Sequence, residues 1–159
     1  MKTIVIGLGN PILGDDGVGW KVAREVSDQL SVISDQSVVV DCASLGGLSL
    51  MERMVGFERA ILIDAMETAE SPVGSVSVIP LEALTNPSAG HSASAHDTSL
   101  ITALQTARTM GLDVPESVEV VAIEAGNVYD FSEELSPPVA RAVPMAVQAV
   151  LDLLEKEAV

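Results

Sequence analysis

The sequence predicts an α/β protein with three layers, α/β/α, built on a five-stranded and mostly parallel sheet. Several short apolar runs alternate with longer stretches whose apolar residues recur at helical spacing, which is typical of β-α-β units. Four such runs lie at residues 4–6, 37–41, 60–64 and 118–123. The second and third runs are nearly all apolar, as in parallel strands covered on both faces. We expect a single domain over 1–159, because this length suffices for one core.

The chain opens with a predicted strand, a glycine-rich loop and a helix. The helix is indicated by apolar residues at helical spacing, namely Val18, Val22, Ala23, Val26 and Leu30. In an open α/β sheet such a loop lies at the carboxyl edge of the strands, where ligands bind. Asp15 and Asp16 lie in this loop. We expect Asp15 to cap the helix and Asp16 to make the edge acidic.

A dinucleotide site in this loop is not expected, although Gly7 and Gly9 are spaced as in the nucleotide-binding fingerprint. Ile12 stands where the third glycine of that fingerprint would let the helix pack closely on the strand. The two adjacent carboxylates would also repel a pyrophosphate.

The middle of the chain predicts a short helix and an edge strand. A helix is expected over 48–55, after the Gly46-Gly47 break. Residues 74–80 alternate small polar and apolar side chains and end at Pro80, as in an edge strand. Because no helix separates this strand from the run at 60–64, we expect it to be antiparallel.

The second half of the chain predicts a loop and two further helices. The segment 85–95 is rich in small and polar residues and is expected to be a mobile surface loop, with His91 exposed. Asp97 or Thr98 is expected to cap a helix that Gly111 ends. Ser136, followed by two prolines, starts the last helix, which Pro144 is expected to kink.

Four sulfur-containing residues are expected to serve packing only. Met51, Met54 and Met110 occupy apolar helical positions and predict core contacts. Cys42 follows an apolar strand and has no basic neighbour in the sequence, so we expect a small core residue rather than a nucleophile.

Composition narrows the possible partners and the compartment. The net charge is −15, from 23 acidic and 8 basic residues, which disfavours nucleic acid and anionic membranes and favours a basic or metal-bearing partner. No apolar run has membrane-spanning length, and the amino-terminal residues lack a signal-peptide pattern. A single cysteine fits a reducing cytoplasm. The oligomeric state is not fixed by the sequence, and a monomer is the default expectation.

Three aspartates are predicted to gather at one edge of the sheet. Asp16 follows the first strand, Asp41 ends the second and Asp64 ends the third. Carboxylates in one crevice repel each other unless a cation or a proton lies between them. This arrangement predicts a metal site or a proton-sharing pair. His96 could add an imidazole, and such a mixed donor set suits nickel, zinc or manganese.

Each aspartate also has a purely structural interpretation. An aspartate at a strand end often caps the turn or helix that follows it. The coincidence of the three positions favours the metal site, but the residues alone leave both interpretations open.

Several motifs occur in a fixed order along the chain. They are Gly7-x-Gly9-Asn10, Asp15-Asp16-Gly17-x-Gly19, the strand-end Asp64, and His96 before a helix. Together they resemble the hydrogenase maturation endopeptidases. The resemblance runs the length of the chain. It implies a protease that removes a carboxyl-terminal peptide from the large-subunit precursor of nickel–iron hydrogenase after nickel insertion. It further implies that Asp16, Asp64 and His96 contact the nickel carried by the substrate, and that Asp41 matches a further acidic position.

The common protease machineries are absent from the sequence. No Ser-His-Asp order, Cys-His pair or His-Glu-x-x-His helix can be assigned. Together with the resemblance, this leads to the hypothesis of an aspartyl-type protease with Asp16, Asp41 and Asp64 as catalytic residues and Asp41 or Asp64 as general base on water. One departure from the family pattern is Cys42-Ala43-Ser44, which stands where the family often has a Gly-Gly-Thr turn.

Two other functions remain as alternatives. The segment Gly7-Leu8-Gly9-Asn10-Pro11 is also similar to the start of peptidyl-tRNA hydrolases. Those enzymes need an early histidine and a basic face, and the first histidine here is His91. A non-catalytic maturation chaperone that binds metal or hydrogenase would share the metal ligands without needing a base.

Overall fold

The computed structural model describes residues 1–33, 37–85 and 95–156. These residues form five strands, four α-helices and two 3-10 turns. In chain order the elements are β1 (Thr3–Leu8), η1 (Gly14–Gly17), α1 (Val18–Ile33), β2 (Val38–Ala43), α2 (Gly47–Met54), β3 (Arg59–Met66), β4 (Val76–Pro80), η2 (Leu81–Thr85), α3 (Ala95–Thr109), β5 (Ser117–Glu124) and α4 (Pro137–Glu155).

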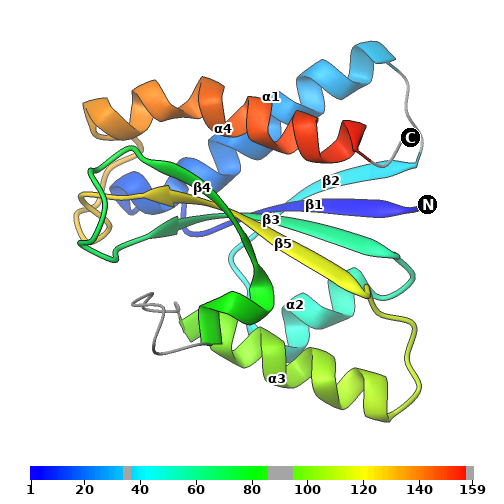
Figure 1. Ribbon diagram of the computed structural model, residues 1–159. Helices are drawn as coiled ribbons and strands as arrows, with labels where there is room; N and C mark the ends of the chain where they lie inside the picture. Colours follow the sequence, from blue (N-terminus) through cyan, green and yellow to red (C-terminus); the bar gives the residue numbers. More distant parts are fainter. Residues whose placement is uncertain (34–36, 86–94, 157–159) are drawn as a thin grey trace.

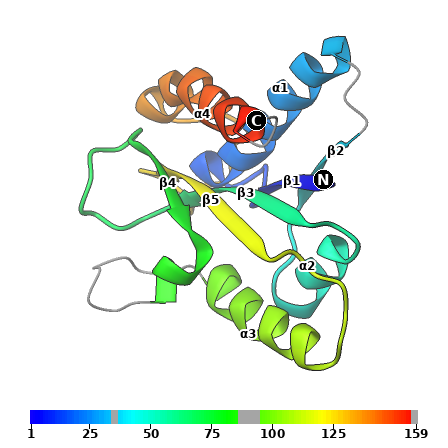
Figure 2. The same ribbon diagram turned by 45° about the vertical axis from the view of Figure 1, so that its right-hand side comes forward.

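The strands form one sheet in the order β2-β1-β3-β5-β4. All neighbouring pairs are parallel except β4 with β5, which is antiparallel. Helices α1 and α4 cover one face of the sheet, and α2 and α3 cover the other (Figures 1 and 2). The predicted three-layer fold with an antiparallel edge strand is therefore confirmed.

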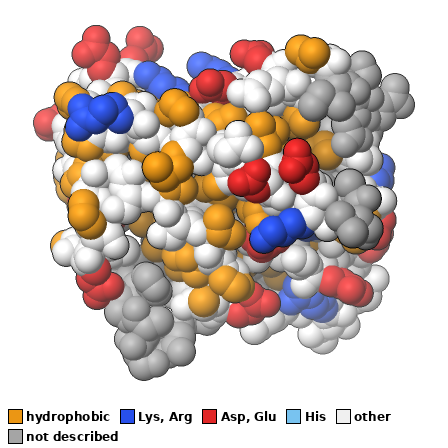
Figure 3. Space-filling model, turned by 45° about the horizontal axis from the view of Figure 1, so that its top comes forward, with side chains coloured by type: hydrophobic (Ala, Val, Ile, Leu, Met, Phe, Trp, Pro, Cys, Tyr) orange, Lys and Arg blue, Asp and Glu red, His pale blue; other side chains and the backbone are white. Residues whose placement is uncertain are grey.

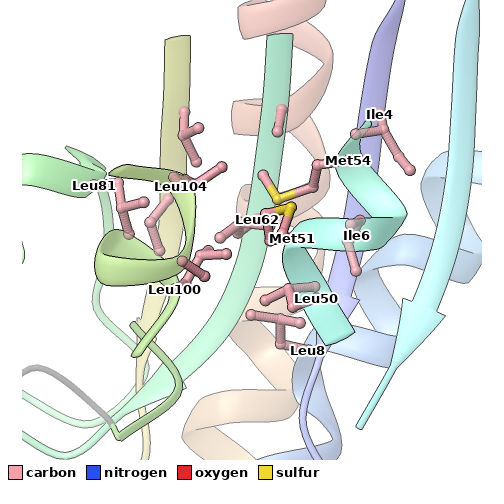
Figure 4. Close-up of a cluster of buried hydrophobic side chains, with 14 of the residues drawn as sticks. Ile4, Ile6, Leu8, Leu50, Met51, Met54, Leu62, Leu81, Leu100 and Leu104 are labelled. Atoms are coloured by element: carbon pink, nitrogen blue, oxygen red, sulfur yellow. The ribbon is translucent and has the colours of Figure 1, made fainter. Parts of the chain in front are cut away.

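Each face of the sheet carries its own hydrophobic core. The core under α2 and α3 includes Met51 and Met54, as predicted (Figure 4). The core under α1 and α4 includes the predicted helix residues Val18, Val22 and Val26. The prediction for Met110 is wrong, because its side chain is 71% exposed. Helix α3 ends at Thr109, so Met110 lies in the following turn and off the buried face of the helix.

The two apolar strands of the sequence differ in burial. Strand β3 lies in the middle of the sheet, and all of its residues are buried, as predicted. Strand β2 lies at the edge, and Val39 is 43% exposed. The expectation that this strand is covered on both faces is therefore wrong, because a continuous valine run does not distinguish an edge strand from a central one.

Two glycines let α1 approach the sheet closely. A Cβ placed on Gly7 would lie 2.2 Å from the carbonyl oxygen of Gly19, and one on Gly19 would lie 2.4 Å from that of Leu8. Neither position has space for a side chain. The close packing of helix on strand, which a third fingerprint glycine would give in a nucleotide-binding protein, comes here from this pair.

Several element boundaries differ from the sequence prediction. Strands β2 and β3 each continue two residues beyond Asp41 and Asp64. Helix α3 begins at Ala95, ahead of the predicted caps Asp97 and Thr98.

Other expectations concern the loop before α3 and the last helix. Most of the predicted loop at 85–95, including His91, lies outside the described residues. Helix α4 begins after Ser136, as predicted, and contains Pro144. No helix in the described ranges is both long and apolar enough to cross a lipid bilayer.

Candidate active site

The carboxyl ends of β1, β3 and β5 lie at one edge of the sheet, on the left of Figure 1. The loop before α4 and the η1 turn lie together at this edge. Ligands of doubly wound α/β proteins bind outside the carboxyl ends of the strands. The acidic residues of this edge are therefore the candidates for the site.

Asp15 has a structural role, but the prediction that it caps the first helix is wrong. Its side chain is completely buried and does not cap α1. Instead, its carboxylate accepts hydrogen bonds from the backbone N–H groups of Gly126 (2.9 Å), Asn127 (3.0 Å) and Ser136 (2.7 Å). The Ser136 hydroxyl donates a fourth, at 2.8 Å. Asp15 thus ties η1 to both ends of the loop between β5 and α4.

These hydrogen bonds keep Asp15 ionised. Burial by itself raises the pKa of this carboxyl, but the hydrogen bonds from Ser136, Gly126 and Asn127 outweigh burial, and the pKa lies below its ordinary value of 3.8. A carboxylate held by four donors has little capacity left to bind a ligand. Asp15 therefore shapes the site without belonging to its reactive surface.

Asp16, the next residue, is only partly buried. The single hydrogen bond that the described residues make to its side chain comes from the backbone N–H of Asn10 to Oδ2, at 2.8 Å. Its backbone carbonyl packs against Gly9, where an added Cβ would lie 2.0 Å away. Gly9 also has φ +122°. The loop therefore needs glycine here, both because a Cβ has no space and because a positive φ disfavours other residues. Among the residues that the structure describes, one Asp16 oxygen is held by Asn10 and the other accepts no hydrogen bond.

Asp64 lies on the central strand β3 and is 2% exposed. Because side chains alternate along a strand, Asp64 points to the same side as Leu62, which belongs to the core under α2 and α3. Strand register aligns Gly7 with Ile63, so Asp64 lies level with Leu8, at the end of β1. It is thus a buried carboxylate at the ligand-binding edge, next to the loop that carries Asp16.

Asp41 lies further from this edge than the sequence suggested. The register aligns it with Ile6 of β1, whereas Asp64 is level with Leu8. Two residues along a strand correspond to about 7 Å. The three aspartates therefore do not meet at one level. The register of β2 and β3 against β1 accounts for the difference.

Asp41 also has a partner of its own. Its carboxylate forms an ion pair with Arg53 of α2, and both side chains are partly exposed. Its other oxygen accepts the N–H of Cys42 at 2.8 Å. The ion pair with Arg53 holds the Asp41 side chain toward α2.

His96 lies in the first turn of α3, on the face of the sheet to which Asp64 points. Its side chain lies outside the described residues, so the proposed trio of Asp16, Asp64 and His96 stays a prediction. Within the described part of the chain, no three His, Cys, Asp or Glu side chains are grouped closely enough to hold a metal ion.

Glu124 is an acid at this edge that the sequence analysis did not single out. It ends β5, aligned with Met66 of β3, and is 6% exposed. Its carboxylate accepts the Thr68 N–H at 3.0 Å and also the Thr68 hydroxyl. The sequence pattern that selected Asp64, an acid at the end of an apolar run, also applies to Glu124. Its bonds to Thr68 anchor the loop that leaves β3.

The turn that departs from the family pattern links β2 to the site loop. The Ser44 hydroxyl donates to the Gly9 carbonyl at 2.6 Å, and the Gly9 N–H donates to the Ala43 carbonyl at 3.2 Å. The neighbouring Cys42 packs against the core, and burial raises the pKa of its thiol. This supports the prediction that Cys42 is a packing residue and not a nucleophile.

The negative charge is not confined to the site. Acidic side chains are scattered over the molecular face in Figure 3, with basic and hydrophobic side chains between them. On this face, therefore, acidic side chains do not form one continuous patch. What distinguishes the site is that Asp64 is buried and Asp16 is held by the backbone.

The fold and the acidic residues at this edge define a doubly wound α/β protein whose ligand-binding edge carries carboxylates. A family model described as hydrogenase maturation protease matches residues 20–153. The chain belongs to the hydrogenase maturation protease family. It is therefore a peptide-bond hydrolase and not the non-catalytic chaperone considered above.

Individual relatives agree with this assignment. The chain is 25% identical over 153 residues to the hydrogenase expression/formation protein HupD of Rhizobium leguminosarum, covering 96% of this chain and 74% of HupD. It is 27% identical to a putative hydrogenase maturation protease of Methanocaldococcus jannaschii, with 96% of each chain covered.

A solved structure supports the fold. The hydrogenase maturating endopeptidase HybD of Escherichia coli matches with a TM-score of 0.78 and 20% identity, over 99% of this chain and 94% of that one. The resemblance inferred from the motifs is thus confirmed at the level of family and fold.

Proposed function

We propose that this protein removes a carboxyl-terminal peptide from the large-subunit precursor of a nickel–iron hydrogenase, and that it recognises the nickel carried by that precursor. The main support is the convergence of two different carboxylates, from β3 and from η1, on the ligand-binding edge of the sheet. We also propose that the enzyme acts in the cytoplasm, as a monomer.

The donor chemistry fits a borderline divalent ion. Asp16 and Asp64 supply oxygens, and His96 in the first turn of α3 would supply an imidazole nitrogen. Mixed oxygen and nitrogen donors suit nickel, and also zinc or manganese. In this proposal the metal is part of the substrate, so a precursor that lacks it would not be held at the edge and would not be cut.

Asp64 is the better candidate for the general base. It is buried at the edge, whereas Asp41 lies about 7 Å further back along the strands and is paired with Arg53. In the proposed step, a carboxylate oxygen of Asp64 accepts a proton from water as the water oxygen attacks the scissile carbonyl. The same proton then passes to the leaving amine.

Cleavage of matched precursors tests this function. The purified protein is incubated with nickel-loaded and nickel-free large-subunit precursor from the same organism, and the products are weighed by mass spectrometry. We expect only the nickel-loaded precursor to lose a carboxyl-terminal peptide. Equal cleavage of both forms would contradict recognition through nickel, and cleavage of neither would contradict the proposed substrate.

A further inference from the structure

The loop at 126–136 exposes two of the few aromatic residues of the protein. The chain contains one tyrosine, two phenylalanines and one tryptophan. Tyr129 and Phe131 lie two residues apart on this loop and are 79% and 84% exposed. Large aromatic side chains are usually buried, and exposed apolar groups that lie together mark interaction sites.

Ile12 extends this surface. An isolated parallel bridge pairs Leu13 with Ser132, and the Ser132 N–H donates to the Ile12 carbonyl at 2.9 Å. The residues just before the bridge, Ile12 and Phe131, are therefore neighbours. Ile12 is 46% exposed. We refer to Ile12, Tyr129 and Phe131 as the aromatic patch.

The loop is held in shape although its aromatic side chains are exposed. The side-chain oxygen of Asn127 accepts the N–H groups of Tyr129 and Asp130, each at 3.3 Å. Asp15 holds both ends of the loop through the hydrogen bonds described above. Rigid aromatic groups lose little conformational freedom on binding, which suits them as anchors for a partner.

The patch borders the candidate active site. Asp15, which holds the loop, directly precedes Asp16 in the same 3-10 turn. The Gly14 N–H also donates to the Ser132 carbonyl, at 2.8 Å. A partner that brings a metal ion to Asp16 therefore lies over or beside the patch.

The charges around the patch indicate the chemistry of the partner. Asp130, Glu133 and Glu134 lie on the same loop, which contains no lysine or arginine. A matching surface would place apolar side chains against the aromatic residues and basic side chains around them.

We propose that the aromatic patch is the docking surface for the hydrogenase large-subunit precursor, and that it binds an apolar segment flanked by lysine or arginine residues near the metal-bearing site. This inference rests on the proposed function for the identity of the partner. It assigns substrate affinity to the patch, and the chemical step to the aspartates.

The test compares a Tyr129→Ser/Phe131→Ser double variant with a matched control. Val32→Ser/Met110→Ser removes two apolar side chains that are 85% and 71% exposed elsewhere on the molecule. Both variants should keep the melting temperature of the wild type, because none of the replaced side chains is buried. For the patch variant we expect KM for the nickel-loaded precursor to rise about 10- to 100-fold with kcat unchanged, as for loss of two interface anchors. The control should change KM by less than about twofold.

Direct binding separates this inference from the proposed function. The dissociation constant for the precursor is measured by calorimetry with the patch substitutions in an Asp64→Asn background, against Asp64→Asn alone. A rise of about tenfold or more supports the docking surface even if the wild type proves not to cleave, which would overturn the proposed function only. An unchanged dissociation constant, or no binding by either protein, overturns the docking surface.

A second copy of the chain is the competing occupant of the patch. Sedimentation of the wild type at micromolar concentration should show a monomer. A wild-type dimer that the double variant abolishes would assign the patch to self-association and overturn the proposal.

Discussion

Asp15 and Asp16 are adjacent in the sequence, yet their carboxylates lie in opposite environments. Asp15 is fully buried and accepts four hydrogen bonds from the loop before α4. Asp16 is partly exposed and accepts one from the described part of the chain, from Asn10. All four hydrogen bonds of the Asp15 carboxylate hold two loops together, whereas one Asp16 carboxylate oxygen accepts no hydrogen bond from the described residues. In our proposal, this acidic pair therefore divides into a structural residue, Asp15, and a ligand-binding residue, Asp16.

The contrast extends to the other acids of the edge. Glu124 resembles Asp15, since its carboxylate anchors a loop through Thr68. Asp64 is the buried acid to which we assign the chemical step. Asp41 is occupied by an ion pair. The predictions below test this division, which follows from the partners of each carboxylate and not from its residue type.

Asp64→Asn should give the largest effect. The amide keeps the size of the side chain but cannot accept a proton, so cleavage of the nickel-loaded precursor should fall by about 100-fold or more. The control is Asp28→Asn on the exposed face of α1, which should cleave at the wild-type rate. Cleavage is measured by mass spectrometry of the precursor. Cleavage by Asp64→Asn at the wild-type rate would show that Asp64 is not the general base.

Asp15→Asn should cause the largest loss of stability. The amide presents hydrogens where the carboxylate accepts, and it leaves buried N–H groups without an acceptor. We expect the free energy of unfolding to fall by about 2–4 kcal/mol, which corresponds to a melting temperature lower by roughly 5–15 °C. Urea unfolding followed by circular dichroism measures this. A loss under about 0.5 kcal/mol would show that the four hydrogen bonds contribute little.

The contribution of Asp15 should also depend on pH. Because the pKa of Asp15 in the folded protein lies below its ordinary value of 3.8, the stabilisation is complete above that value and is lost as pH falls below it. The difference in unfolding free energy between the wild type and Asp15→Asn should therefore be constant above about pH 5 and shrink toward pH 3. A difference that grows on acidification would contradict an ionised Asp15.

Breaking the ion pair of Asp41 should have the smallest effect. Both side chains are substantially exposed, so Arg53→Ala should cost less than about 1 kcal/mol of stability.

If Asp41 is not the base, Asp41→Asn should also keep at least about a tenth of the wild-type cleavage rate, well short of the loss of about 100-fold or more expected for a missing general base. A loss as large as that of Asp64→Asn would reassign the base to Asp41.

The sequence was sufficient to predict the layers of the fold. Alternating apolar runs and amphipathic stretches depend on local spacing, and they placed β1, β3 and β5 and the helices between them correctly. The edge position of β2 could not be predicted, because Val38, Val39 and Val40 would suit a central strand equally well. Strand order depends on packing between distant segments, which spacing within one segment does not encode.

The site was predictable in part for a similar reason. Counting acids at strand ends located Asp16 and Asp64 at the edge. It could not show that Asp41 lies two residues further back, because register depends on pairing between strands. Nor could it identify the role of Asp15, since its hydrogen-bond donors Gly126 and Ser136 are more than a hundred residues away in the chain.

The division between the two adjacent aspartates can be tested most directly with Asp16→Asn. Its cleavage rate on the nickel-loaded precursor and its melting temperature are measured together, with Asp15→Asn as the paired variant. We predict that Asp16→Asn loses about 100-fold or more in cleavage while its melting temperature stays within about 3 °C of the wild type. A destabilised Asp16→Asn that still cleaves at the wild-type rate would show that Asp16, like Asp15, is structural, and would contradict the proposed site.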